Sequence, residues 1–74
     1  MPLINVRLIE GVFEEHEKQA MIEKLTDTMV EIEGENMRGV TWVLIDEVKS
    51  GDWGLAGDPL TTQAVKSLRA GVPA

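Results

Sequence analysis

Residues 1–11 read MPLINVRLIEG and contain the first predicted element of the chain. Residues 3–9 are rich in β-branched and other apolar side chains, which predicts a β-strand. Glu10 and Gly11 end this strand. Alternation gives it an apolar face that carries Ile4, Val6 and Leu8. The other predicted face is half apolar and carries Leu3, Asn5, Arg7 and Ile9.

The next stretch has the period of a helix, which we predict from about residue 14 to residue 33. An apolar stripe runs along it at spacings of four, four and three residues. The stripe consists of Met21, Leu25, Met29 and Ile32. After a connection at 35–39, residues 40–45 predict a second strand that continues to Val48. The near-continuous apolar run of this strand indicates burial on both faces.

A strand, a helix and a strand in this order predict a single β-α-β unit with parallel strands, so the fold class is α/β. Residues 49–59 are predicted to be a loop. Thr61 or Thr62 is placed to cap a short last helix that runs through Ala70, and a hairpin is the alternative for this C-terminal part.

Length and composition predict one domain, 1–74, that needs support beyond its own core. The chain has no cysteine, which excludes disulfides. It has one histidine, His16, and this argues against a histidine-based metal site. One helix can cover only one face of a two-stranded sheet, so we expect the other face to be covered by another subunit.

The formal net charge is −6, from 13 acidic and 7 basic residues. This charge argues against nucleic acid and against an anionic membrane surface as partners. No stretch approaches the roughly 18 apolar residues of a spanning helix, and the first residues lack the basic region of a signal peptide. We therefore expect a cytoplasmic protein.

Pro2 is the first candidate for chemistry. Removal of Met1 would leave Pro2 with a free secondary amine, whereas proline inside a chain is an amide without N–H or basicity. Such an amine can take a proton or attack a carbonyl if its pKa is brought near neutral pH.

The order of these features resembles the 4-oxalocrotonate tautomerase family, in its small single-domain members. The resemblance covers roughly residues 2–57: Pro2 opens a strand, Glu10-Gly11 closes it, and an acidic amphipathic helix and a second strand follow. The glycine-containing stretch GDWGLAG at 51–57 completes it. The resemblance implies a hexamer built as a trimer of dimers. It also implies enol–keto proton transfer with the proline amine as general base, without cofactor or metal.

The resemblance also implies roles for further residues. Trp53 falls where the family has an aromatic residue that lines the site. Val12 and Trp42 fall where the family has two arginines that bind substrate carboxylates, so this chain lacks both arginines. Trp42 is then either core or a wall of the site.

Two other arginines are candidate substrate ligands or surface ion-pair groups. They are Arg38, just before the second strand, and Arg7. Asp52, next to Trp53, is a turn residue or an acid that orients water. The substrate-binding candidates are thus Trp53, Trp42, Arg38 and Val12, with Pro2 as the catalytic residue.

The function predicted from these residues is a tautomerase for a small 2-hydroxy-enoate or related enol acid. Loss of the two arginines favours a more apolar or monoanionic enol over a dicarboxylate. One alternative is a hydratase, dehalogenase or decarboxylase of the same superfamily that uses a protonated Pro2. The other alternative is a non-catalytic oligomeric member that lost the site.

Overall fold

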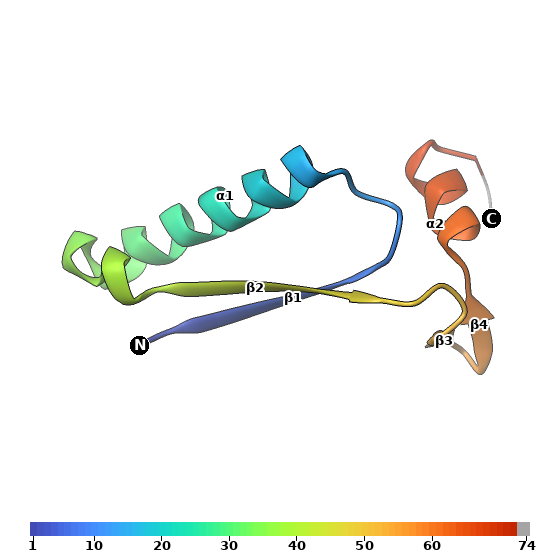
Figure 1. Ribbon diagram of the computed structural model, residues 1–74, viewed down its shortest axis with the longest axis horizontal. Coiled ribbons are helices and arrows are strands. Elements are labelled where there is room, and N and C mark those ends of the chain that lie inside the picture. The colour runs from blue at the N-terminus through green and yellow to red at the C-terminus, as the bar shows by residue number, and fades with distance from the viewer. Residues whose placement is uncertain (73–74) are drawn as a thin grey trace. The chain divides into compact units, whose positions relative to one another are not determined.

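A computed structural model describes residues 1–72 of the chain (Figure 1). Its elements in chain order are β1 (Leu3–Ile9), α1 (Glu15–Glu33), the 3-10 helix η1 (Glu35–Val40), β2 (Trp42–Val48), β3 (Trp53–Leu55), β4 (Asp58–Leu60) and α2 (Thr62–Arg69). These elements belong to two compact units. The first unit contains residues 1–6 and 14–46, and the second contains residues 7–13 and the chain from Glu47 onward. That residues 1–74 form one domain stays a prediction.

The strands β1 and β2 pair with each other and are parallel. In the first unit, the backbone N–H of Trp42 donates to the carbonyl of Pro2 at 3.0 Å. In the second unit, the N–H of Glu10 donates to the carbonyl of Val48 at 2.8 Å. Both strands therefore advance in the same direction between the two bonds, which confirms the predicted α/β class and the parallel pairing.

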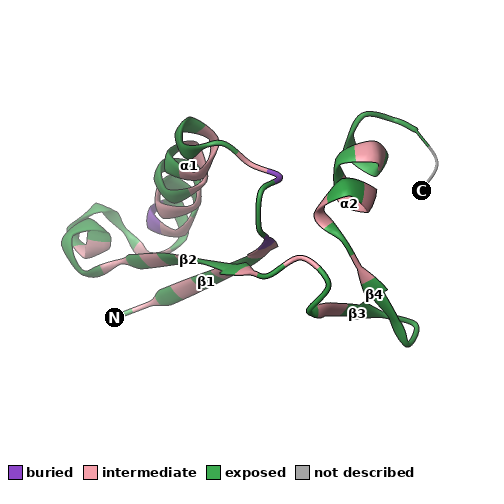
Figure 2. Ribbon diagram, turned by 45° about the vertical axis from the view of Figure 1, so that its right-hand side comes forward, coloured by how far each residue is buried: buried purple, intermediate pink, exposed green. Residues whose placement is uncertain are grey.

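Helix α1 lies along the parts of β1 and β2 that belong to its own unit (Figures 1 and 2). The Glu17 carboxylate accepts the Glu14 N–H at 3.0 Å and caps the start of the helix. Gly34, at a φ of 103°, ends the helix and donates its N–H to the Val30 carbonyl at 2.8 Å. Within residues 1–72, no helix has the length and apolar character needed to cross a membrane.

Two details of the first unit differ from the prediction. Val30 is buried on α1, whereas Ile32 is 79% exposed and lies off the stripe assigned to it. The second strand begins at Trp42 and not at residue 40, because Val40 ends η1. The Thr41 hydroxyl donates to the Met37 carbonyl at 2.8 Å, so a side chain closes this last turn of η1.

The core of the single chain is small (Figure 2). Among the described residues, the buried apolar side chains are Ile9, Val12 and Val30. The predicted burial of β2 on both faces is wrong for this chain alone, because Trp42 is 52% and Leu44 43% exposed. Ile9 is 5% exposed, so its predicted place on the open face is wrong as well.

Leu3 is exposed as predicted, and with Trp42 and Leu44 it forms what we call the open face of the first unit. On the same face, the Asn5 amide donates to the Asp46 carboxylate at 2.7 Å. Exposed apolar patches of this kind commonly mark interaction surfaces. The open face therefore matches the predicted need for a covering subunit, and assembly itself stays a prediction.

In the second unit, β3 and β4 form an antiparallel hairpin in which Trp53 pairs with Leu60 and Leu55 with Asp58. Two residues connect the strands, Ala56 at a φ of 52° and Gly57 at a φ of 85°. Positive φ at both positions is the type I′ geometry that matches the twist of paired strands. The prediction of a loop throughout 49–59 is therefore wrong over the hairpin.

Helix α2 confirms the predicted last helix, with Thr61 as its cap. The Thr61 hydroxyl oxygen accepts the Ala64 N–H at 3.2 Å. The next residue, Thr62, donates its hydroxyl to the Glu10 carbonyl at 2.6 Å and its N–H to the Ser50 hydroxyl oxygen at 2.9 Å. One threonine thus joins α2 to the end of β1 and to the segment after β2.

Replacement of Gly11 should be costly. Gly11 has a φ of 79°, and an added Cβ would lie 3.1 Å from Cγ2 of Thr62. We expect Gly11→Ala to lower the free energy of unfolding by about 1–2 kcal/mol, measured by urea denaturation at fixed protein concentration. Gly39→Ala is the matched control, because nothing lies within 4 Å of that Cβ position and its φ is not positive. Equal effects of the two substitutions would contradict the argument.

Candidate active site

Pro2 immediately precedes β1 and is partly buried. Its carbonyl is held by the Trp42 N–H at 3.0 Å, so the position of Pro2 depends on the start of β2. Met1 precedes it and is 77% exposed. While Met1 is present the Pro2 nitrogen is an amide, and removal of this accessible residue would turn it into a basic amine.

Trp42 is the predicted site residue that the structure brings next to Pro2, through this backbone bond. Its side chain stands on the open face with half of its surface exposed. An indole in this position offers a flat apolar surface and one N–H donor. In the single chain Trp42 is therefore not core.

Arg38 is engaged by two carboxylates of its own unit. Its Nη1 lies 2.7 Å from Oδ1 of Asp27, and its Nε lies 3.0 Å from Oε1 of Glu35. Hydrogen bonds that the guanidinium donates to the carboxylates of Glu35 and, second, of Asp27 raise its pKa further above its usual range. The pair with Asp27 ties η1 to α1, and a substrate bound by Arg38 would compete with two neighbouring acids.

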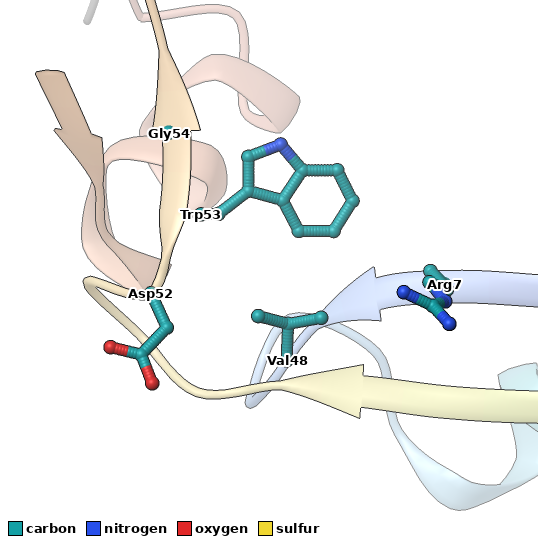
Figure 3. Close-up of a pocket in the computed structure, with 5 residues that line it drawn as sticks. All are labelled: Arg7, Val48, Asp52, Trp53 and Gly54. Atoms are coloured by element: carbon teal, nitrogen blue, oxygen red, sulfur yellow. The ribbon is translucent and has the colours of Figure 1, made fainter. Parts of the chain in front are cut away.

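Trp53 lines a cavity of about 340 Å³ in the second unit (Figure 3). The other lining residues are Arg7, Val48, Asp52 and Gly54. Trp53 comes from β3, Arg7 from β1 and Val48 from β2, and Asp52 precedes β3. The cavity therefore joins a cation, a carboxylate and an aromatic plane.

A second cavity of about 270 Å³ shares Arg7 and Trp53 with the first. Its lining is mainly apolar and includes Phe13, Leu60, Val65 and Leu68. Sequence reasoning did not find these four residues. The i,i+3 pair of Val65 and Leu68 on a helix was a usable signal, whereas Leu60 depended on a hairpin that was not predicted.

Val12 is 8% exposed and does not line either of these two cavities. Its carbonyl accepts a hydrogen bond from Nη1 of Arg69 at 3.3 Å. The Arg69 guanidinium lies 4.6 Å from the centroid of the Phe13 ring, in cation–π geometry. Within residues 1–72, no three His, Asp or Glu side chains are grouped so that they could hold a metal ion.

Residues 2–63 match the family model described as tautomerase enzyme. A probable tautomerase K2 of Dickeya dadantii (strain 3937) is 39% identical over 62 residues, which cover 82% of this chain and 90% of the relative. The 2-hydroxymuconate tautomerase of Pseudomonas putida is 42% identical over 57 residues, which cover 77% of this chain and 87% of the relative.

The crystal structure of DmpI from Helicobacter pylori is similar with a TM-score of 0.69 and 36% identity. The match covers 80% of this chain and 95% of that chain. The parallel β1–β2 pair and α1 thus have their counterparts in a solved protein of this type. The chain belongs to the tautomerase family. Membership of this family supports an isomerase activity for the chain.

The ion pairs of Arg38 should contribute to stability in a salt-dependent way. We expect Arg38→Gln to lower the melting temperature in low-salt buffer, and the difference from wild type to shrink at about 1 M NaCl, where charges are screened beyond about 3 Å. Lys24→Gln removes the same charge from the exposed surface of α1 and serves as the control. If both variants melted alike at low salt, the ion pairs would have no structural role.

Proposed function

We propose that this protein is a tautomerase in which the amine of Pro2, after removal of Met1, is the general base. The supporting observation is the position of Pro2, which is the first residue of the family match and immediately precedes β1. The neutral amine would take the enol O–H proton, and the oxygen would keep the electron pair that forms the carbonyl. The resulting prolinium would give the proton to carbon, where the electron pair of the enol C=C bond forms the new C–H bond, so the substrate isomerises without net gain or loss of protons.

This mechanism requires a Pro2 amine that is largely unprotonated near neutral pH. Burial disfavours the charged form of an amine and lowers its pKa. Pro2 is already partly buried in the single chain. If another copy covered the open face, more water would be excluded from Pro2. For this reason we propose a homo-oligomer, a hexamer, as the active form.

The proposed substrate is a small 2-hydroxy-enoate that carries one carboxylate and an apolar group. Val12 and Trp42 replace the two arginines that the family resemblance assigns to carboxylate binding, so a dicarboxylate would lack its usual partners. Trp42 and Trp53 offer aromatic surface instead. Phenylenolpyruvate has one carboxylate and an apolar group. By contrast, 2-hydroxymuconate, which gives the Pseudomonas putida relative its name, is a dicarboxylate.

Substitution of Pro2 tests the proposal. We expect Pro2→Ala to lower kcat/KM for the ketonisation of phenylenolpyruvate, followed by ultraviolet absorbance, by about 100-fold or more, because general base catalysis is typically worth that much. The circular dichroism spectrum and the assembly state should not change. Intact mass must confirm that Met1 is absent from the wild type and from the variant.

A second preparation provides the matched control. An N-terminal extension that cannot be removed keeps the side chain of Pro2 and turns its nitrogen into an amide. This protein should lose activity as Pro2→Ala does. Full activity of either protein would contradict the role of the amine. A wild type that retains Met1 and has no activity would favour a non-catalytic member of the family.

A further inference from the structure

The apolar cavity of about 270 Å³ belongs entirely to the second unit. Its wall comes from the end of β1 and the turn that follows, from the β3–β4 hairpin and from α2. The lining contains two aromatic rings, those of Phe13 and Trp53, and aliphatic side chains that include Leu60, Val65 and Leu68. Arg7 lines the cavity as well, but it already has an interaction in the structure, so we assign no ligand charge to it.

Helix α2 is fixed at both ends against the segment that follows β1. At its start, the Thr62 hydroxyl donates to the Glu10 carbonyl at 2.6 Å. At its end, the Arg69 guanidinium lies 4.6 Å from the centroid of the Phe13 ring. The two cavity-lining residues of the helix lie between these anchors. This part of the wall is therefore in place before a ligand arrives, which lowers the cost of binding.

The helical part of the wall also lies outside the part of the chain that the family match covers. Val65 and Leu68 both come after residue 63, where the match to the tautomerase family ends. They are three residues apart and so lie on the same side of α2. Val65 is partly buried, whereas Leu68 is 65% exposed. The cavity is therefore open to solvent beside Leu68, and a small molecule can enter there.

The lining defines the chemistry of the ligand. In another protein, an apolar cavity of roughly 150 Å³ lined by leucine, isoleucine and phenylalanine binds benzene. The cavity described here has the same kinds of side chain and a volume of about 270 Å³, which leaves room for a substituent on the ring. The net charge of −6 disfavours an anion. An uncharged ring with a short alkyl group therefore matches this lining best.

We propose that the second unit binds a small uncharged aromatic molecule, a benzene ring with a short alkyl substituent, in the apolar cavity that has α2 as one wall. Contacts with the rings of Phe13 and Trp53 and with the aliphatic side chains of α2 supply the affinity. This ligand site is independent of the proposed function, because its lining residues belong to the second unit and Pro2 belongs to the first.

A titration of the full-length protein with toluene, followed by methyl NMR with labelled isoleucine, leucine and valine, tests the site. We expect saturable shifts of the methyl signals of Leu60, Val65 and Leu68, because the ring of the ligand would lie against them. The methyl signals of Leu3 and Leu44, on the open face of the first unit, should not move. Benzoate has the same ring with a carboxylate and should bind about tenfold more weakly or worse, because its charge would lose water.

Two substitutions of Val65 change the cavity in opposite directions. Val65→Phe fills the cavity and should weaken toluene binding about tenfold or more, because a close-packed wall leaves the ligand no space. Gln63→Phe is the matched control, since it adds the same ring at an exposed position of α2 that does not line the cavity. Val65→Ala enlarges the cavity and should shift the preference from toluene to propylbenzene. This shift of preference can be measured even if Val65→Phe does not fold.

Several results would overturn the proposal. They are the absence of saturable shifts, toluene shifts confined to the open face, and equal loss of binding in Val65→Phe and Gln63→Phe. Benzoate binding as tight as that of toluene would contradict the ligand class. A wild type that does not bind toluene, together with a changed oligomeric mass of Val65→Phe in light scattering, would assign the cavity to a second copy of the chain. None of these measurements depends on the activity of Pro2, so this proposal and the proposed function can fail separately.

Discussion

The parallel pairing of β1 with β2 is the constraint on which the rest of the structure depends. Each end of the pairing is closed by a backbone hydrogen bond, from Trp42 to Pro2 at one end and from Glu10 to Val48 at the other. Parallel strands need a long crossover, and α1 supplies it. The first bond holds the proposed base against the backbone of Trp42, and the second precedes the turn at Gly11, where Thr62 connects α2 to the strand.

The three arginines of the chain have different surroundings. Arg38 and Arg69 both contact groups of the protein itself, two carboxylates in one case and a ring with a carbonyl in the other. Arg7 is one of the residues that line two cavities of the second unit.

The sequence was sufficient to predict the helices and strands that have a clear hydrophobic period or a capping residue. The strand 3–9, the long helix and the helix capped by Thr61 all appear in the structure where they were predicted. The hairpin was missed because its turn lacks the usual Asn-Gly or Asp-Gly signal. Ala56 occupies the first turn position, where φ is positive. Pro59 lies within β4, and a proline normally argues against a strand, although edge strands tolerate it.

For the candidate site, sequence reasoning proposed Pro2, Trp42 and Trp53, which stay predictions, and it could not rank the arginines. Their ranking depends on contacts between residues apart in the chain, such as that of Arg38 with Asp27. The apolar stripe of α1 was misplaced at Ile32 for a related reason, because η1 follows directly and changes what the end of the helix can cover.

The small core has a thermodynamic consequence. With Ile9, Val12 and Val30 as the buried apolar side chains of the described chain, little of the folding free energy is available within one copy. If another copy covers the open face, the free energy of association becomes part of the free energy of folding. Dilution would then act as a denaturant, and the melting temperature would rise with protein concentration.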